Sequence, residues 1–192
     1  MKLIDNGVSV VELYTNEGVV SIELYELEAP CAAKSFLQLA ESGQLNGARF
    51  ERMVPGFLLE CRVEGDMAYG ELTEAEEGKT LRHTGAGIVS CYGSVVEKGR
   101  FFITLAPQPK LDGVCTIFGR VYSGMSIVRK ISQSRVMEEN FRLYTPVVIQ
   151  RCTVRVLPRE DRPGSFVKGK GTTSPRDGPC CEVKGNLLND LE

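Results

Sequence analysis

Short apolar runs separated by turn residues recur along the first 160 residues. The runs Val8–Tyr14 and Gly18–Tyr25 are rich in β-branched and aromatic residues, and the polar turn between them predicts a β-hairpin. Further strands are predicted at residues 49–54, 57–63, 87–92, 101–106, 116–122 and 147–157. In the last of these, the apolar residues share one parity, which is typical of a half-buried strand: Val148, Cys152, Val154 and Val156.

Two segments have a helical period instead. After Pro30, apolar residues at i, i+3, i+4 and i+7 predict a helix over residues 30–42 that stops before Gly43: Ala33, Phe36, Leu37 and Ala40. A second helix is predicted over residues 124–133 from Ile127, Val128 and Ile131. We expect four side chains of these helices to face the interior: Phe36, Leu37, Ile127 and Ile131. Because strand–helix–strand alternation is missing, the pattern indicates a mainly β fold, a closed eight-stranded antiparallel β-barrel capped by two α-helices.

The C-terminal residues differ in composition from the rest of the chain. Residues 159–179 consist largely of Pro, Gly, Ser, Thr, Lys and Asp, which is typical of a linker. The chain closes on a short apolar stretch at residues 187–191. We therefore divide the chain into a domain over residues 1–158 and a polar, linker-like arm over residues 159–192. The arm is a candidate contact for a protein partner in a larger complex.

Charge and cysteine content narrow the functional classes. Lys and Arg number 23 and Asp and Glu 25, a net charge of −2 that makes direct binding to nucleic acid unexpected. No apolar run reaches the roughly 18 residues of a membrane span, and residues 1–5 are too polar for a signal peptide, so we expect no membrane association. Seven cysteines with no CxxC spacing favour reduced thiols in the cytoplasm or nucleus. Vicinal Cys180 and Cys181 could be redox-active or metal-binding, but with one histidine in the chain we expect no metal and no cofactor.

The residues alone show no nucleophile–base pair and no phosphate-binding loop. His83 lies between Arg82 and Thr84, which favours a structural role in a polar loop. Arg52 is the more interesting side chain, because it lies among apolar residues and would share a face of a regular strand with Phe50. An ordinary surface cation is the plainer interpretation of Arg52, and composition leaves that alternative open.

The run from Phe50 to Phe57 resembles the cyclophilin signature F-H-R-x-x-x-x-F, with Glu51 in place of the histidine. Further blocks resemble the family in the same order, at residues 20–25, 29–30, 46–47, 83–90, 101–107, 111–113 and 116–121. The resemblance covers about residues 8–157, and residues 104–107 and 116–121 are similar to small nuclear, spliceosome-type cyclophilins. It implies an eight-stranded barrel and peptidyl-prolyl cis–trans isomerase activity on proline-containing peptides and proteins.

Position by position, the resemblance implies that Arg52 is the catalytic residue. It places four residues at the proline pocket: Phe57, Leu58, Phe102 and Leu111. Other substrate-binding positions carry residues unusual for the family: Glu60 and Arg100 for two glutamines, Tyr92 for an alanine, Lys110 for a tryptophan and Cys115 for a histidine. We expect Arg52, Phe57 and Phe102 to converge on one groove, with three residues at its edge: Leu58, Leu111 and Cys115.

These departures leave two functional predictions open. The retained Arg52, Phe57 and Phe102 favour a working but slower isomerase. The lost glutamines and histidine favour instead a non-catalytic module that binds a proline-containing loop in a larger assembly, such as a spliceosomal complex. A loop shortened between residues 65 and 70 lowers one wall of the groove. Because Lys110 replaces the tryptophan commonly used for cyclosporin, we expect weak or no cyclosporin binding.

Overall fold

The computed structural model of the chain describes residues 7–63, 81–92 and 99–158. Its elements are, in chain order, β1 (Gly7–Thr15), β2 (Gly18–Leu24), α1 (Pro30–Glu41), β3 (Arg49–Val54), β4 (Leu58–Arg62), β5 (Ile88–Tyr92), β6 (Arg100–Thr104), the 3-10 helix η1 (Pro109–Leu111), β7 (Cys115–Ser123), α3 (Met125–Ser132) and β8 (Arg142–Pro158). In this part of the chain, none of the helices has the length and hydropathy needed to cross a membrane.

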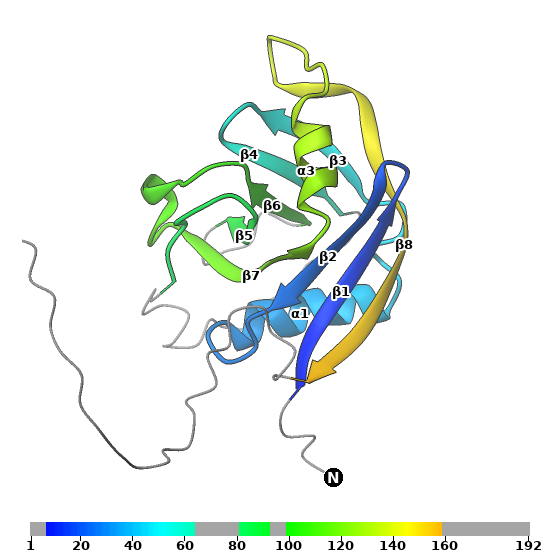
Figure 1. The fold of residues 1–192 in the computed structure, drawn as a ribbon, viewed down its shortest axis with the longest axis vertical. Coiled ribbons are helices and arrows are strands. Elements are labelled where there is room, and N and C mark those ends of the chain that lie inside the picture. The colour runs from blue at the N-terminus through cyan, green and yellow to red at the C-terminus, as the bar shows by residue number, and fades with distance from the viewer. Residues whose placement is uncertain (1–6, 64–80, 93–98, 159–192) are drawn as a thin grey trace, which may run out of the picture.

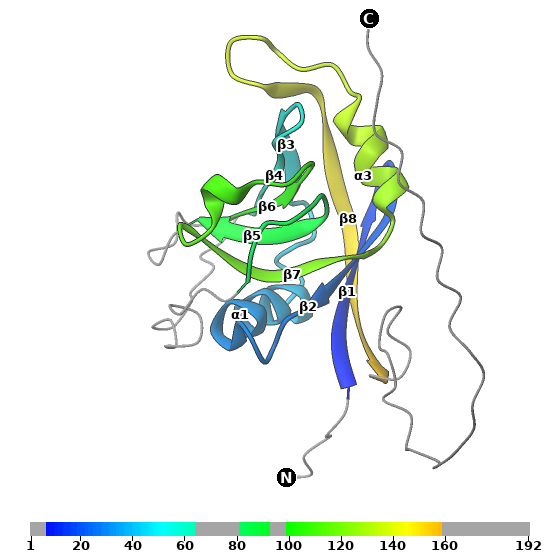
Figure 2. The same cartoon turned by 60° about the vertical axis from the view of Figure 1, so that its left-hand side comes forward.

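The strands close into a barrel in the order β1-β2-β7-β5-β6-β4-β3-β8. Every pairing in it is antiparallel, and the ladder between β1 and β8 closes the barrel from Gly7 opposite Pro158 onward. Figures 1 and 2 show α1 beneath the barrel. Helix α3 contacts β2 and turns Val128 and Ile131 into the core. The predicted eight-stranded barrel with two helices is confirmed.

The barrel interior is apolar and built around aromatic rings. Phe36 of α1 meets Phe101 and Phe118 with ring centroids 5.1 and 5.0 Å apart, and Phe50 lies 5.9 Å from Phe101. All four rings are fully buried, so α1 closes one end of the barrel with its apolar face. Pro30 occupies the first turn of α1, and Gly43 follows the helix with a φ of +74°, as its sequence signals predict.

The side chains expected to face the interior do contact it. Phe36 and Ile131 are buried in the core, while Leu37 and Ile127 are partly buried against it. Both helices end within a residue or two of their predicted limits. Hydrophobic periodicity was therefore sufficient to orient both helices on the barrel.

The parity predicted for β8 is wrong. Tyr14 pairs with Arg151 but Thr15 pairs with Ile149, so a β-bulge at Gln150 exchanges the two faces of the strand. Before the bulge the buried residues are Val147 and Ile149, with Val148 on the other face; after it Cys152 and Val154 pack against the core. Val156 is 60% exposed rather than buried.

Several predictions fall on residues that the structure does not describe. They concern the arm over residues 159–192 with Cys180 and Cys181, the shortened loop between residues 65 and 70, and the segment after Tyr92. The strand over residues 49–54 has its predicted limits, and most other strand limits differ by one or two residues, as where Phe57 precedes β4. The largest difference is in β8, which begins at Arg142, five residues earlier than expected.

Candidate active site

Arg52 reaches the outside of the barrel through an irregularity in β3. Phe50 pairs with Cys61 and Arg52 with Glu60, so Glu51 is an extra residue, a β-bulge. Cys61 and Glu60 are neighbours on β4 and point to opposite faces, and their partners therefore do so too. Phe50 lies in the core and Arg52 on the outer face, and the expectation that they share a face is wrong.

A row of side chains crosses four strands on this outer face. In register from β3 to β5, Arg52 lies opposite Glu60, Glu60 opposite Phe102, and Phe102 opposite Ser90. Neighbouring strands in a sheet are about 4.8 Å apart, so Arg52 and Phe102 are about two strand spacings apart with Glu60 between them. The cation and the apolar pocket residue that the resemblance singles out thus lie on one surface.

An apolar floor adjoins this row. Leu58, Phe102 and Cys115 are buried together, and four residues pack partly buried against them: Val54, Phe57, Tyr92 and Leu111. This second cluster is separate from the barrel core. All five residues predicted for the proline pocket and its edge meet here. Leu58 and Cys115, expected at the edge of the groove, belong to its buried floor.

Glu60 is the hub of the polar side of the groove. Its Oε2 lies 3.5 Å from the Arg52 guanidinium, its Oε1 lies 3.5 Å from that of Arg100, and the Tyr92 hydroxyl donates to Oε2 at 2.9 Å. The Glu60 side chain is only 9% exposed, whereas Arg52 and Arg100 are 43% and 39% exposed. Burial and the neighbouring Glu60 carboxylate raise the pKa of Tyr92 above its usual range, so this hydroxyl stays a proton donor. Arg52 is thus oriented by a buried carboxylate while its own head stays in contact with solvent.

His83 supports the groove from behind. It lies in a loop and has the structural role predicted for it, but its side chain is fully buried rather than in polar surroundings at the surface. Its Nδ1 lies 2.9 Å from Asp112 Oδ1 and its Nε2 lies 3.0 Å from Ser90 Oγ. The His83 backbone N–H donates to the same Asp112 oxygen at 2.7 Å, and this bond is the main reason that the pKa of Asp112 is lowered. The His83 ring also stacks on Phe102 at 6.3 Å between centroids.

This Ser–His–Asp chain has the connectivity of an acyl-transfer triad, but Ser90 is fully buried in the structure. A nucleophile must reach its substrate, so the arrangement is a brace that ties residues 81–84, η1 and β5 together behind Phe102. Sequence reasoning predicted a structural role for His83 but not its partners. Asp112 lies 29 residues from His83, and only the fold brings the two together.

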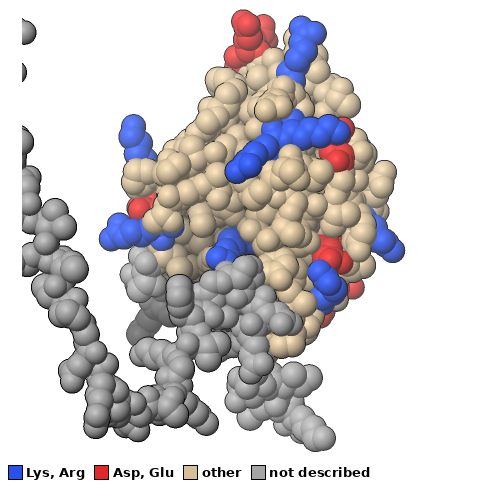
Figure 3. Space-filling view, viewed as in Figure 1, with Lys and Arg blue, Asp and Glu red and all other residues tan. Residues whose placement is uncertain are grey.

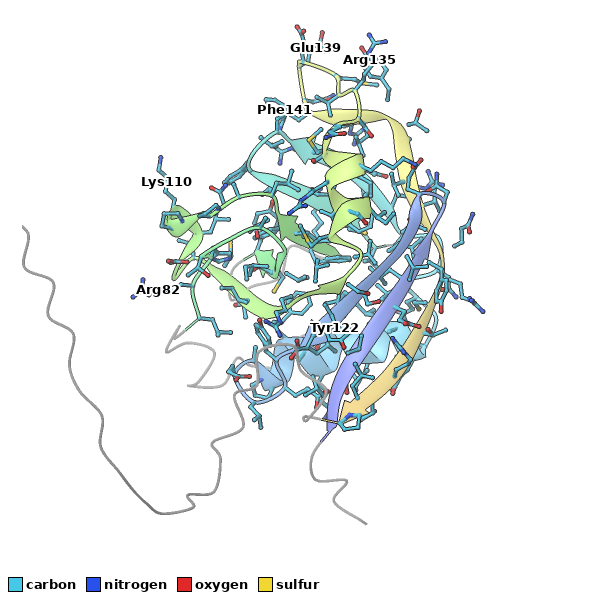
Figure 4. All side chains as sticks on the ribbon, viewed as in Figure 1. Arg82, Lys110, Tyr122, Arg135, Glu139 and Phe141 are labelled. Carbon is cyan, nitrogen blue, oxygen red and sulfur yellow. The ribbon has the colours of Figure 1, made fainter. Side chains whose placement is uncertain are left out.

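Lys110 is set apart from the row. It lies in η1, is exposed, and projects from the outer margin of the domain, as Arg82 also does (Figure 4). On the face shown in Figure 3, basic and acidic side chains are dispersed over a largely uncharged surface. Among residues 7–63, 81–92 and 99–158 no cluster of His, Cys, Asp and Glu has the geometry to hold a metal ion.

The closed barrel defines a structural class. The fold resembles a cyclophilin-type peptidyl-prolyl cis–trans isomerase from Cryptosporidium parvum with a TM-score of 0.67 and 24% sequence identity, over 79% of this chain and 99% of that one. A structure of that protein in the presence of the dipeptide Ala-Pro gives a TM-score of 0.65 at 23% identity, over 76% of this chain and 98% of that one. At these identities the likeness shows the fold.

Sequence comparison is more specific. The family model for "Cyclophilin type peptidyl-prolyl cis-trans isomerase/CLD" matches residues 10–154. The chain is 40% identical over 134 residues to peptidyl-prolyl cis-trans isomerase-like 1 of Aspergillus niger, covering 66% of this chain and 83% of that protein. It is 41% identical over 133 residues to peptidyl-prolyl cis-trans isomerase ppi1 of Schizosaccharomyces pombe, covering 65% and 86%. The chain belongs to the family of cyclophilin-type peptidyl-prolyl cis–trans isomerases, a family that binds proline-containing peptides.

Proposed function

We propose that this chain accelerates rotation about X–Pro peptide bonds with Arg52 as its catalytic residue, and that it does so more slowly than cyclophilins with a glutamine in place of Glu60. The observation that carries the proposal is the register that puts Arg52 and Phe102 on one outer face, two strands apart. The barrier to X–Pro rotation is about 20 kcal/mol because twisting breaks amide conjugation. A site that binds the twisted amide better than either planar isomer lowers that barrier.

Arg52 supplies the interaction that strengthens on twisting. As the amide twists, the prolyl nitrogen becomes pyramidal and gains a lone pair. A guanidinium stays charged and holds its N–H donors in a rigid plane, so Arg52 can donate to that lone pair and has less to bind in the planar ground state. Phe57 and Leu111, partly buried on the floor of Leu58, Phe102 and Cys115, offer the proline ring an apolar surface, which excludes water and strengthens the hydrogen bond.

Glu60 supports the proposal of a reduced rate. Its carboxylate lies against Arg52 and offsets part of the charge on which transition-state stabilisation depends. Glu60→Gln keeps a hydrogen-bond acceptor for Tyr92 and removes the negative charge. We expect this variant to increase kcat/KM in a coupled prolyl-isomerase assay on several X–Pro peptides. Glu17→Gln, which breaks a surface ion pair with Lys130, is the matched control and should leave kcat/KM unchanged.

A second candidate function is a binding module that recognises a proline-containing loop without useful turnover. The shared carboxylate favours it, because Glu60 faces Arg52 and Arg100 at the same distance and restrains the guanidinium that would have to act. The same assay separates the two functions. Turnover that is equal in the wild type and in Arg52→Ala, with peptide binding retained, identifies the module.

Three finer proposals accompany the activity. Weak or absent cyclosporin binding is supported by the exposed Lys110, which offers no broad apolar face. A cytoplasmic or nuclear location is supported by the five cysteines in the described residues, none of which forms a disulfide there. A partner in a protein complex, bound through residues 159–192, is supported by the polar composition of that arm.

A further inference from the structure

Arg52 has a second charged neighbour, on the side of β3 away from Glu60. Arg142, the first residue of β8, is its register partner. The hydrogen bond next to this pair joins the flanking residues: the Met53 N–H donates to the Phe141 carbonyl at 2.9 Å. Arg52 and Arg142 are therefore a non-hydrogen-bonded pair of the antiparallel ladder. In such a pair the Cα atoms are only about 4.5 Å apart and the two side chains leave the sheet on the same face. Two arginines therefore stand next to each other at the end of the row that leads to Phe102.

Like charges directly opposite each other destabilise a sheet. Arg52 is compensated by Glu60 at 3.5 Å. Arg142 is exposed, and within the described residues its guanidinium has no ion-pair partner. Glu51, the nearest carboxylate along β3, forms no ion pair with either arginine in this part of the chain. Glu139 lies at the outer end of the preceding loop, beside Arg135 and farther from the barrel than Phe141 (Figure 4).

The backbone fixes Arg142 in this unfavourable place. Its N–H donates to Asn140 Oδ1 at 2.9 Å, and its carbonyl accepts from the Met137 N–H at 2.8 Å. Phe141, just before it, has a φ of +59°, an unusual conformation for a bulky side chain, and its N–H donates to the Met137 carbonyl at 2.8 Å. Strain of this kind persists where the surrounding structure over-determines it, which is common at ligand-binding sites.

We propose that Arg142 forms an anion-binding subsite next to the proline groove, so that the preferred substrates carry a carboxylate or phosphate side chain near the proline. This inference rests on the proposed function for where the proline sits. From Phe102 to Arg142 there are three strand steps, or about 14 Å, which an extended peptide covers in about four residues. Because an arginine side chain can extend over part of this distance, we expect the anion two to four residues from the proline. Arg52, already paired with Glu60, remains directed at the prolyl nitrogen.

The test uses the full chain and a set of eight-residue peptides with one Ala-Pro bond. Each peptide carries a single Glu, Gln or phosphoserine, placed in turn at two to four residues on either side of the proline. Affinity is measured by titration calorimetry, and cis–trans exchange is measured on the same peptides by NMR. We expect Glu to bind about two- to fivefold tighter than Gln at one or two adjacent positions, the range of a solvent-exposed ion pair. The difference should shrink as salt is raised.

Three variants assign the effect to Arg142. Arg142→Gln should abolish the preference for Glu over Gln, and Arg142→Lys should retain most of it. Arg129→Gln removes the same charge from the exposed face of α3 and should retain all of it. Removing Arg142 also relieves the repulsion of Arg52, so the melting temperature of Arg142→Gln should equal or exceed that of the wild type, which a structural role would not produce.

The outcomes separate this inference from the proposed function. A larger gain for phosphoserine than for Glu identifies phosphate as the better-matched anion, and equal gains identify the carboxylate; both support the subsite. Equal binding of the Glu and Gln peptides at every position overturns it, and so does a preference that survives Arg142→Gln. A preference for Glu without any acceleration of exchange supports the subsite and overturns the proposed catalysis.

Discussion

Phe101 and Phe102 are adjacent in β6 and both are fully buried, yet they belong to two different environments. Phe101 points into the barrel and packs edge-on against Phe36 and Phe50. Phe102 points outward, into a small cluster that borders the ion pairs of Glu60. The first environment is large, dry and aromatic, and it stabilises the fold. The second is small and bounded by charge, and it forms the binding surface.

The largest difference between the two environments should appear in stability. We expect Phe101→Ala to lower the free energy of unfolding by about 3–5 kcal/mol, because it opens a cavity that the closed barrel cannot collapse to fill. Phe102→Ala should cost less, since its surroundings near the surface can relax, but it should abolish binding of an Ala-Pro peptide. Urea unfolding and calorimetry measure the two effects. An equal loss of stability in both variants would show that Phe102 is ordinary core.

The second prediction concerns activity at constant stability. Arg52→Ala should reduce kcat/KM for an X–Pro peptide about tenfold or more, because one charged hydrogen bond in the transition state is worth ~1.5–3 kcal/mol. Its free energy of unfolding should change by less than about 1 kcal/mol, since the Arg52 side chain is 43% exposed and Glu60 keeps its ion pair with Arg100. Arg129→Ala is the control on an exposed helix face. A loss of activity that merely follows a loss of stability would contradict the catalytic role.

The third prediction tests whether the residue at position 110 controls cyclosporin binding. Lys110→Trp should increase cyclosporin affinity about tenfold, because an indole adds a broad apolar face and an N–H donor at the margin of the floor. Titration calorimetry on both forms measures the gain. Nanomolar binding by the unmodified chain, or no gain from the tryptophan, would show that this position does not control affinity here.

The smallest expected effect is on acid stability. The His83 backbone N–H lowers the pKa of Asp112, so the ionised carboxylate stabilises the fold at neutral pH, and this stability is lost as the pH falls through the lowered pKa. The melting temperature of the wild type should therefore fall below about pH 4, the ordinary pKa of an aspartate, and this fall should be smaller in Asp112→Asn. Glu17→Gln provides the comparison. An unchanged acid limb in Asp112→Asn would mean that the brace behind Phe102 is not held by charge.

Hydrophobic periodicity predicted the barrel and its helices well because those patterns are local. The parity of β8 and the face of Phe50 were predicted wrongly for one shared reason. Bulges at Gln150 and Glu51 each add a residue that the partner strand lacks, and no feature within the strand itself marks where this occurs. At Glu51 the extra residue is what turns Arg52 out of the barrel, so the wrong prediction falls at the candidate site itself.

The polar side of the groove shows a second limit of sequence reasoning. The resemblance identified Glu60, Tyr92 and Arg100 as departures from the family. That Tyr92 and Arg100 both contact the Glu60 carboxylate depends on the register of three strands. The His83–Asp112 contact likewise depends on chain segments far apart in sequence. Residue types can be read from the sequence, whereas their mutual distances follow from the closed sheet.

The closing ladder of the barrel has a consequence for how the domain can be connected. Gly7 lies opposite Pro158, so the first and last residues of the barrel are neighbours on β1 and β8, at the end of the molecule away from η1 and the groove (Figure 1). A circularly permuted chain that joins Pro158 to Gly7 through a short linker would retain this ladder. For the same reason the domain can be inserted into a surface loop of another protein through one narrow attachment point, with its groove facing outward.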